Sequence, residues 1–300
     1  MTKELFIGSG VALVTPFKND GIEVDYSKVE ELIEYHIKNG TDSIIVAGTT
    51  GESSTLEYLE HEKLIEFAVK CANGRIPIIA GTGSNNTRRA VELTKKAEYL
   101  GADGSLSVTP YYNKCSQKGL IEHYKKIASS TTLPIIIYNV PSRTGVNIET
   151  TTAIELSKVP NIIGIKEASG NIEQIKTIIE NTDKNFYVYS GNDDQIVDII
   201  ELGGKGVISV LANICPQNTH NICKSALEAD FKTARQMQIE YLELIKALFC
   251  EVNPQPIKEA MNYLGYSVGD LREPLTTLEE HNYKRLTKTI DNYQKNGLIK

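Results

Sequence analysis

The sequence alternates short β-branched runs with amphipathic stretches, and this alternation repeats eight times. The predicted strands end near residues 15, 47, 81, 109, 138, 166, 190 and 209, so consecutive ends lie 19 to 34 residues apart. This spacing is the length of a strand followed by a helix. Eight such units predict an α/β fold, the (β/α)8 TIM barrel, whose usual size is about 250 residues. The predicted strands are Val11–Thr15, Ser43–Ala47, Ile76–Gly81, Gly104–Thr109, Pro134–Tyr138, Ile162–Lys166, Tyr187–Ser190 and Gly206–Ser209.

A doubly wound parallel sheet is the structural alternative. The dinucleotide fingerprint G-x-G-x-x-G is missing after the first predicted strand, and the sequence has neither a P-loop nor an H-E-x-x-H motif. After Asn213 the chain indicates only helices: Ile214–Glu228, Phe231–Leu248, Ile257–Leu264 and Leu278–Asn296. We expect the first of these helices to close a barrel formed by residues 1–228. The other three predict a helical appendage, residues 229–300, which packs on the barrel because no flexible linker separates them.

Charge and cysteine usage exclude several classes of function. With 32 Lys and Arg against 38 Asp and Glu, the net charge of −6 gives no general attraction for nucleic acid or an anionic membrane. The five cysteines are odd in number and form no C-x-x-C pair, which favours a reduced, cytoplasmic protein without a zinc site. No apolar run approaches the roughly 20 residues of a membrane-spanning helix, and residues 1–10 do not resemble a signal peptide.

In a barrel of this kind, the chemistry lies at the C-terminal ends of the strands. Those ends offer mainly hydroxyl and phenol groups, with one lysine, Lys166, and no histidine. The five histidines fall in or beside predicted helices, which argues against a histidine metal site and a Ser-His-Asp triad. We interpret His36, on an apolar helix stripe, as a core or interface residue and Cys115 as incidental.

Lys166 ends an apolar strand and is expected to point its amine into the barrel mouth. Desolvation there disfavours the ammonium form and lowers the lysine pKa. A neutral amine is the nucleophile that forms a Schiff base with a ketone or aldehyde. The structural alternative is a lysine that reaches solvent or pairs with Glu167.

Tyr138 and Arg143 lie on the preceding strand end and its loop. Neighbouring barrel strands place Tyr138 beside Lys166, so its phenol can move protons during imine chemistry. A guanidinium at Arg143 is a natural bidentate clamp for a carboxylate. The alternatives are a buried core tyrosine with a satisfied hydroxyl and an arginine in a surface ion pair.

The segment Gly48–Thr55 follows the second predicted strand. Its glycines let the backbone approach a ligand, and its N–H groups and threonine hydroxyls suit a small carboxylate, although such a stretch is also typical of a plain turn. Tyr111 and Tyr112 add two phenols at another strand end. Adjacent side chains diverge, so we expect these two to serve different neighbours.

Together these segments resemble the pyruvate-dependent Schiff-base lyase/synthase family, which includes N-acetylneuraminate lyase. The likeness covers nearly the whole chain, and the joint order of the segments makes it specific. They are Gly10–Phe17, Gly48–Ser53, Val108–Asn113, Tyr138–Gly145, Gly164–Ala168, Ser190–Gly191, Gly206–Val210 and Asn253–Lys258. The resemblance implies condensation of pyruvate with L-aspartate 4-semialdehyde, the first step of the diaminopimelate and lysine branch.

The resemblance also implies roles for individual residues. Lys166 forms the imine with pyruvate, and Thr49, Tyr138 and Tyr112 form a proton relay in which Tyr112 comes from a neighbouring subunit. The substrate-binding positions are Thr50 for the pyruvate carboxylate, Arg143 for the semialdehyde carboxylate, and Gly191 with the backbone of Ile208 for the pocket wall. No metal or organic cofactor is implied. The family usually assembles as a tetramer, a dimer of dimers.

A second pocket of the family, which binds lysine in inhibited members, is partly recognisable. The matching positions are Ser53, Ser54, His61, Asn85 and Tyr111. Tyr58 and Arg89 depart from the pattern, since sensitive bacterial members carry a histidine and a glutamate there. We therefore expect weak or absent inhibition by lysine, unless Glu57 or Glu92 meets the ammonium group instead. Two functional alternatives remain: a sister aldolase with another acceptor, and a non-catalytic barrel that senses a keto acid.

Overall fold

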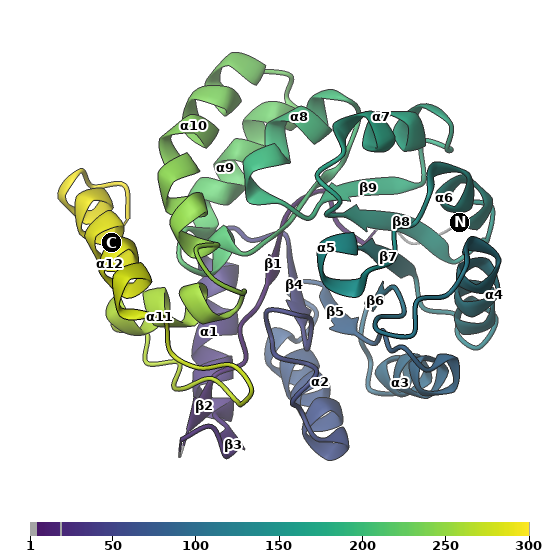
Figure 1. Ribbon diagram of the computed structural model, residues 1–300, viewed down its shortest axis with the longest axis horizontal. Coiled ribbons are helices and arrows are strands. Elements are labelled where there is room, and N and C mark those ends of the chain that lie inside the picture. The colour runs from purple at the N-terminus through teal and green to yellow at the C-terminus, as the bar shows by residue number, and fades with distance from the viewer. Residues whose placement is uncertain (1–4, 19, 300) are drawn as a thin grey trace.

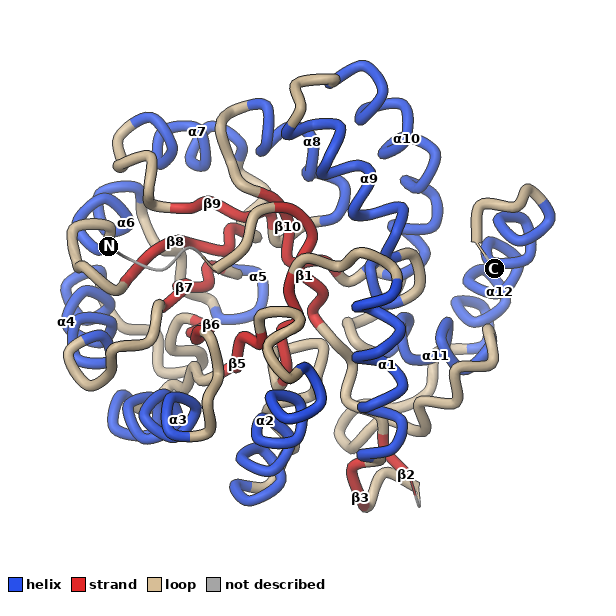
Figure 2. The backbone as a smooth tube through the Cα atoms, turned by 180° about the vertical axis from the view of Figure 1, so that it is seen from behind, coloured by secondary structure: helices blue, strands red, loops and turns tan. Residues whose placement is uncertain are grey.

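A computed structural model describes residues 5–18 and 20–299 (Figure 1). Within this part of the chain, eight parallel strands close into a barrel in the order β1-β10-β9-β8-β7-β6-β5-β4, with helices outside them (Figure 2). The strands are β1 (Gly8–Ala12), β4 (Ser43–Val46), β5 (Ile78–Gly81), β6 (Gly104–Val108), β7 (Ile135–Asn139), β8 (Ile162–Glu167), β9 (Tyr187–Ser190) and β10 (Gly206–Ser209). The predicted (β/α)8 barrel is confirmed.

The first strand differs most from its prediction, because it begins at Gly8 rather than Val11. A Cβ atom on Gly206 would lie 1.8 Å from the Gly8 carbonyl oxygen, so β1 and β10 approach more closely than side chains allow. Gly8 and Gly10 thus belong to a tightly packed strand. After the strand, the N–H of Val14 donates to Asn213 Oδ1 at 3.1 Å, which ends its pairing in the barrel. A hairpin of β2 (Phe17–Lys18) and β3 (Glu23–Val24) follows and is too short to leave a sequence signal.

The outer helices follow the amphipathic stretches. Asp25 caps the first of them through the Lys28 N–H, and its buried stripe is Val29, Leu32, Ile33 and His36, as predicted. The helices of the barrel are α1 (Tyr26–Lys38), α2 (Tyr58–Ala72), α3 (Thr87–Tyr99), α4 (Gln117–Ala128), α5 (Pro141–Thr144), α6 (Thr150–Leu156), α7 (Ile172–Glu180), α8 (Ile196–Glu201) and α9 (Pro216–Leu227). Two short 3-10 turns, η1 (Asp193–Gln195) and η2 (Leu211–Asn213), follow β9 and β10.

Three further helices follow the barrel: α10 (Phe231–Leu248), α11 (Gln255–Tyr263) and α12 (Glu280–Lys295). α10 packs on α9, and α12 packs on α10 and α11 at the outer edge (Figure 1); a single hydrophobic cluster runs from Val11 in β1 to Leu286 and Ile290 in α12. The division into residues 1–228 and 229–300 stays a prediction, and its outermost residues, 1–4 and 300, lie outside the described residues. The expectation about a signal peptide falls partly on residues 1–4 as well. In the described ranges, no helix combines the length and apolar character that crossing a membrane requires.

Candidate active site

A cavity of about 200 Å³ opens at the C-terminal ends of the barrel strands. Six of the predicted site residues line it: Thr49, Thr50, Tyr138, Arg143, Lys166 and Gly191. Lys166 comes from β8 and Tyr138 from β7, where the two residues are direct register partners. Gly191 forms part of the wall, where a Cβ atom would lie 2.6 Å from the Ala168 methyl group. The strand-end rule therefore brings these groups together from the C-terminal ends of four strands, β4, β7, β8 and β9.

The Lys166 side chain is buried, with 6% of the residue exposed. Its pKa is lowered from 10.5 to about 7, chiefly by burial; the Asp193 charge raises it, and the nearby Arg143 charge lowers it. Its Nζ lies 4.4 Å from the centroid of the Tyr138 ring. Near neutral pH a large share of this amine is unprotonated, which is the state that attacks a carbonyl carbon.

Glu167 does not pair with Lys166. Successive strand residues point to opposite faces, so Glu167 leaves the barrel interior and faces Gln174 of α7. Its buried carboxylate accepts hydrogen bonds from Asn139 Nδ2 at 2.5 Å, Gln174 Nε2 at 3.1 Å and Ser169 Oγ at 2.5 Å. The alternative of a Lys166–Glu167 ion pair is therefore wrong, and the carboxylate instead fixes the backbone that follows the lysine.

Tyr138 is a buried phenol whose hydroxyl is hydrogen-bonded to Thr49. Burial raises its pKa, while the charge of Arg143 and the Thr49 hydrogen bond act in the opposite direction. The net direction is upward, so the phenol keeps its proton at neutral pH. A protonated phenol beside the amine can donate to an oxygen that forms on a bound carbonyl and recover the proton through the threonine hydroxyl.

Thr50 and Arg143 are both tied to Asn253, a residue that the sequence interpretation did not assign to the site. The Asn253 Nδ2 group donates to Thr50 Oγ1 at 3.0 Å, and Arg143 Nη2 donates to the Asn253 carbonyl oxygen at 2.9 Å. The Asn253 Oδ1 atom is buried without a hydrogen-bond partner among the described residues, and the residue lines the cavity. Asn253 stands in one of the segments that carry the family resemblance, but only the folded chain brings it to Thr50.

Asp193 is a second site residue that sequence reasoning missed. It lies in η1, just beyond the β9 end, and its carboxylate accepts from the N–H groups of Val210 at 3.0 Å and Leu211 at 2.9 Å. Burial raises its pKa, and its charge raises the pKa of Lys166. An acidic residue two positions after Gly191 was the available signal, but it lies beyond the strand end, in a turn whose direction the strand pattern does not predict.

Two predicted site residues do not line this cavity. Ile208 in β10 is fully buried in the barrel interior, in a cluster with Ile45, Ile136 and Tyr189. Tyr112 is 90% exposed and has a left-handed backbone with φ of 73°. Its ring therefore contacts solvent in the isolated chain, away from Lys166.

A second cavity, of about 630 Å³, adjoins the first and shares Thr49 and Arg143 with it. Its wall contains all seven predicted regulatory positions: Ser53, Ser54, Tyr58, His61, Asn85, Arg89 and Tyr111. His61 is buried and hydrogen-bonded to the Gly81 carbonyl oxygen at 2.8 Å. Burial and the positive charge of Arg89 both lower its pKa. The cavity thus holds a neutral imidazole beside a guanidinium.

The two residues interpreted as structural lie away from both cavities. His36 is buried in α1 and bonded through Nδ1 to Thr41 Oγ1 at 2.9 Å, and burial lowers its pKa to about 3. Burial likewise raises the pKa of the Cys115 thiol, which keeps it in its less reactive protonated form.

The chain matches the model of the dihydrodipicolinate synthetase family over residues 5–293. It is 54% identical to a 4-hydroxy-tetrahydrodipicolinate synthase from Caldicellulosiruptor bescii over 96% of this chain and 97% of that protein. The dihydrodipicolinate synthase structure from Aquifex aeolicus is 48% identical, with a TM-score of 0.94 over 96% of this chain and 98% of the other. A structure of DHDPS from Cyanidioschyzon merolae with lysine bound is 40% identical, with a TM-score of 0.94 over 99% of this chain and 100% of the other.

Proposed function

The chain belongs to the dihydrodipicolinate synthetase family and condenses pyruvate with L-aspartate 4-semialdehyde to 4-hydroxy-tetrahydrodipicolinate, and we propose that Lys166 is its imine-forming nucleophile. This lyase reaction opens the diaminopimelate and lysine branch. The observation that supports the assignment is the buried amine, whose pKa is lowered to about 7. Perturbed lysines of this kind in a cleft are typical of catalytic sites.

In the proposed mechanism, the neutral Lys166 amine attacks the keto carbon of pyruvate. Two protons pass in turn from the nitrogen to the oxygen, which leaves as water, and a neutral imine remains. Transfer of a proton from the methyl group to the imine nitrogen then gives an enamine, whose carbon attacks the aldehyde of the second substrate. The amino group of that substrate finally displaces Lys166 and closes the ring. Tyr138 and Thr49 are hydrogen-bonded to each other beside the amine, so they are placed to move these protons.

Carboxylate binding follows from the polar groups around the cavity. We propose that Thr50 and the adjacent loop N–H groups bind the pyruvate carboxylate, and that Arg143 binds the carboxylate of the semialdehyde. Arg143 lies where the two cavities meet, with one guanidinium nitrogen bonded to Asn253 and the others available. Because Gly191 has no side chain, we propose that it lets pyruvate approach Lys166 closely. We propose that Ile208 contributes only its backbone to the wall of the pocket.

We further propose that the protein acts as an oligomer, a tetramer built as a dimer of dimers, in which Tyr112 completes the relay of a neighbouring subunit. The 90% exposure of Tyr112 supports this, because a ring placed on the surface of its own chain is available to a second copy. Leu59 and Tyr99 are also large apolar residues with 76% and 82% exposure. On the basis of the five unpaired cysteines, we propose a cytoplasmic location.

Regulation by lysine is proposed to be weak. Arg89 stands in the wall of the second cavity and already depresses the pKa of His61 through its charge. A lysine ammonium group entering there would meet a like charge instead of a carboxylate. Glu92 is engaged on the outside of α3 with Arg88, at 3.6 Å, rather than with the cavity.

A direct test of these roles is turnover of pyruvate with aspartate semialdehyde by wild-type, Lys166→Ala and Lys232→Ala protein. Lys232 is an exposed lysine at the start of α10 and serves as the matched control. We expect Lys166→Ala to lose nearly all activity and Lys232→Ala to retain it. Retention of activity by Lys166→Ala would refute the assignment of the nucleophile. Faster turnover with an aldehyde that lacks a carboxylate would favour a sister aldolase.

A further inference from the structure

The loop that carries Thr49 and Thr50 is held in place by a carboxylate just outside the cavity. Glu52, two residues after Thr50, is 3% exposed and has a left-handed backbone, with φ of 53°. Its N–H donates to the Thr49 carbonyl oxygen at 3.1 Å, so the turn at Glu52 fixes the backbone of the catalytic threonine. A glutamate in this conformation persists only where surrounding contacts determine it.

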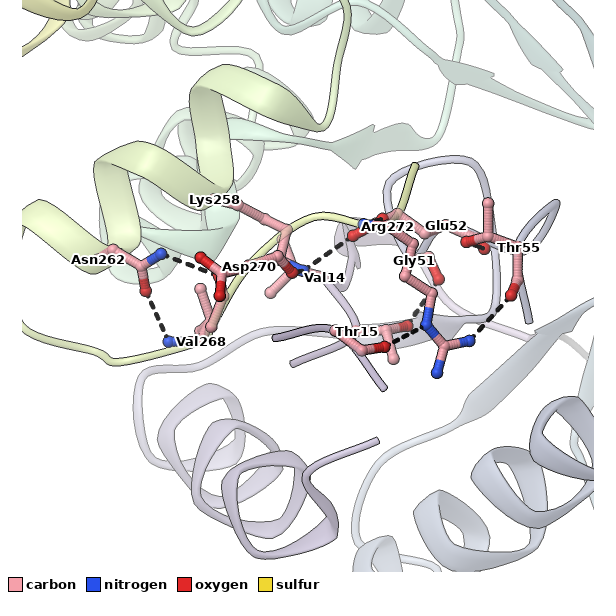
Figure 3. Close-up of polar contacts among 12 residues, drawn as sticks. Val14, Thr15, Gly51, Glu52, Thr55, Lys258, Asn262, Val268, Asp270 and Arg272 are labelled. Carbon is pink, nitrogen blue, oxygen red and sulfur yellow. Dashed lines mark hydrogen bonds and ion pairs between the residues drawn. The ribbon is translucent and has the colours of Figure 1, made fainter. Parts of the chain in front are cut away.

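Those contacts come from the far end of the sequence (Figure 3). Lys258 in α11 donates from Nζ to Glu52 Oε1 at 2.8 Å, and both side chains are 1% exposed. The same ammonium group donates to the Asp270 carbonyl oxygen at 2.6 Å and lies 4.3 Å from the centroid of the Phe17 ring. The second oxygen, Glu52 Oε2, accepts from the Arg272 N–H at 3.0 Å.

Neighbouring contacts tie the same loop to the same C-terminal segment. The Arg272 guanidinium donates to the Thr55 carbonyl oxygen at 2.8 Å and forms a bidentate pair with Glu60 at the start of α2, with both distances 2.7 Å. Asn253 holds the Thr50 hydroxyl at 3.0 Å. Residues 253–272 therefore contact the loop at Thr50, Glu52 and Thr55.

We propose that Glu52 and Lys258 are positioning residues for pyruvate, whose buried ion pair lets the C-terminal helices set Thr49 and Thr50 at the required distance from Lys166. This proposal rests on the proposed roles of the two threonines. An ion pair with both partners buried is a poor source of stability, because desolvation offsets most of the attraction and an apolar pair of similar volume stabilises as well. The charged groups instead supply specificity. Their hydrogen bonds can all form in only one conformation of the loop. Small displacements of substrate-positioning groups reduce catalysis steeply.

The test compares Glu52→Gln, Lys258→Met and the double variant with the control Lys246→Met, which breaks the exposed Lys246–Glu243 pair of α10. For each protein, the KM for pyruvate, the KM for the semialdehyde, kcat and the melting temperature are measured. We expect the pyruvate KM of the Glu52 and Lys258 variants to rise by at least about tenfold, with a change below about twofold in the semialdehyde KM. The control should match the wild type.

The double variant separates positioning from stability, because it leaves no unpaired buried charge. We expect it to recover most of the melting temperature lost by the single variants while its pyruvate KM stays at least about tenfold raised. A double variant with wild-type pyruvate KM would overturn the proposal, as would single variants that bind pyruvate normally. Equal changes in both KM values would also overturn it, because they would indicate a general loss of structure.

Thr50→Ala distinguishes failure of this inference from failure of the proposed function. If Thr50→Ala raises the pyruvate KM and the Glu52 and Lys258 variants do not, the ion pair is structural and only the positioning proposal fails. If Thr50→Ala itself leaves the pyruvate KM unchanged, the carboxylate-binding role of Thr50 fails first.

Discussion

The protonation state of Lys166 gives the most quantitative prediction. With a pKa of about 7, half of the amine is neutral at pH 7. At the usual pKa of a lysine, only about one molecule in 3,000 would be neutral at that pH. The barrel interior therefore raises the reactive fraction by roughly three orders of magnitude, equivalent to about 4 kcal/mol. We expect the rate of imine formation to fall about tenfold per pH unit below this pKa and to level off above it.

Asp193→Asn perturbs this pKa in a defined direction. The carboxylate raises the pKa of Lys166 by favouring the ammonium form, so its loss must lower that pKa. The amide oxygen of asparagine can still accept from the N–H groups of Val210 and Leu211, which preserves the turn after β10. We expect the acidic limb of the rate profile to move to lower pH by about one unit.

The assay measures the rate of single-turnover imine formation after rapid mixing with pyruvate. It covers pH 5 to pH 9, about two units either side of the lysine pKa. Asp194→Asn is the matched control, because Asp194 is the exposed neighbour with the same charge. Its profile should coincide with that of the wild type. A limb that stays in place or moves to higher pH in Asp193→Asn would refute the electrostatic reasoning, and so would a wild-type midpoint near that of free lysine.

Three further predictions concern the substrates, the assembly and regulation. Arg143→Ala should leave pyruvate imine formation at pH 8 largely intact and reduce use of the semialdehyde by roughly 10- to 150-fold; equal loss for both substrates would show a structural role. Mixing inactive Tyr112→Phe and Lys166→Ala subunits should restore activity in verified mixed oligomers, and no recovery would argue against shared sites. Lysine titration at saturating pyruvate should give half-inhibition above about 1 mM, and Arg89→Glu should strengthen inhibition; tighter wild-type inhibition would contradict our interpretation of the cavity.

The repeat of strands and helices was enough to predict the barrel and the neighbourhood of Lys166 and Tyr138. Consecutive strands of such a barrel are neighbours, and the residues at their C-terminal ends share one face. The start of β1 was not predicted because Gly8 and Gly10 lack the β-branched signal of a strand; here Gly8 leaves room for the Asp42 carboxylate and Gly10 for the Phe6 ring.

The remaining site residues depend on contacts that no local pattern encodes. Asn253 meets Thr50 across 203 residues of sequence, and Lys258 meets Glu52 across 206. Only the packing of α10–α12 on the barrel sets these distances. Asp193 lies in a short 3-10 turn whose direction the strand pattern does not predict. Tyr112 is exposed and lies outside the cavity of its own chain, so the relay role that we propose for it requires a second chain.

The central claim is that pyruvate forms a covalent imine with one lysine, Lys166. Incubation with pyruvate and sodium borohydride, followed by mass spectrometry of the digested protein, reports this bond directly, because reduction makes the imine permanent. We predict a single reduced pyruvate adduct on the peptide that contains Lys166, and none in Lys166→Ala protein. An adduct on another lysine, or an active enzyme that yields no adduct, would contradict the account.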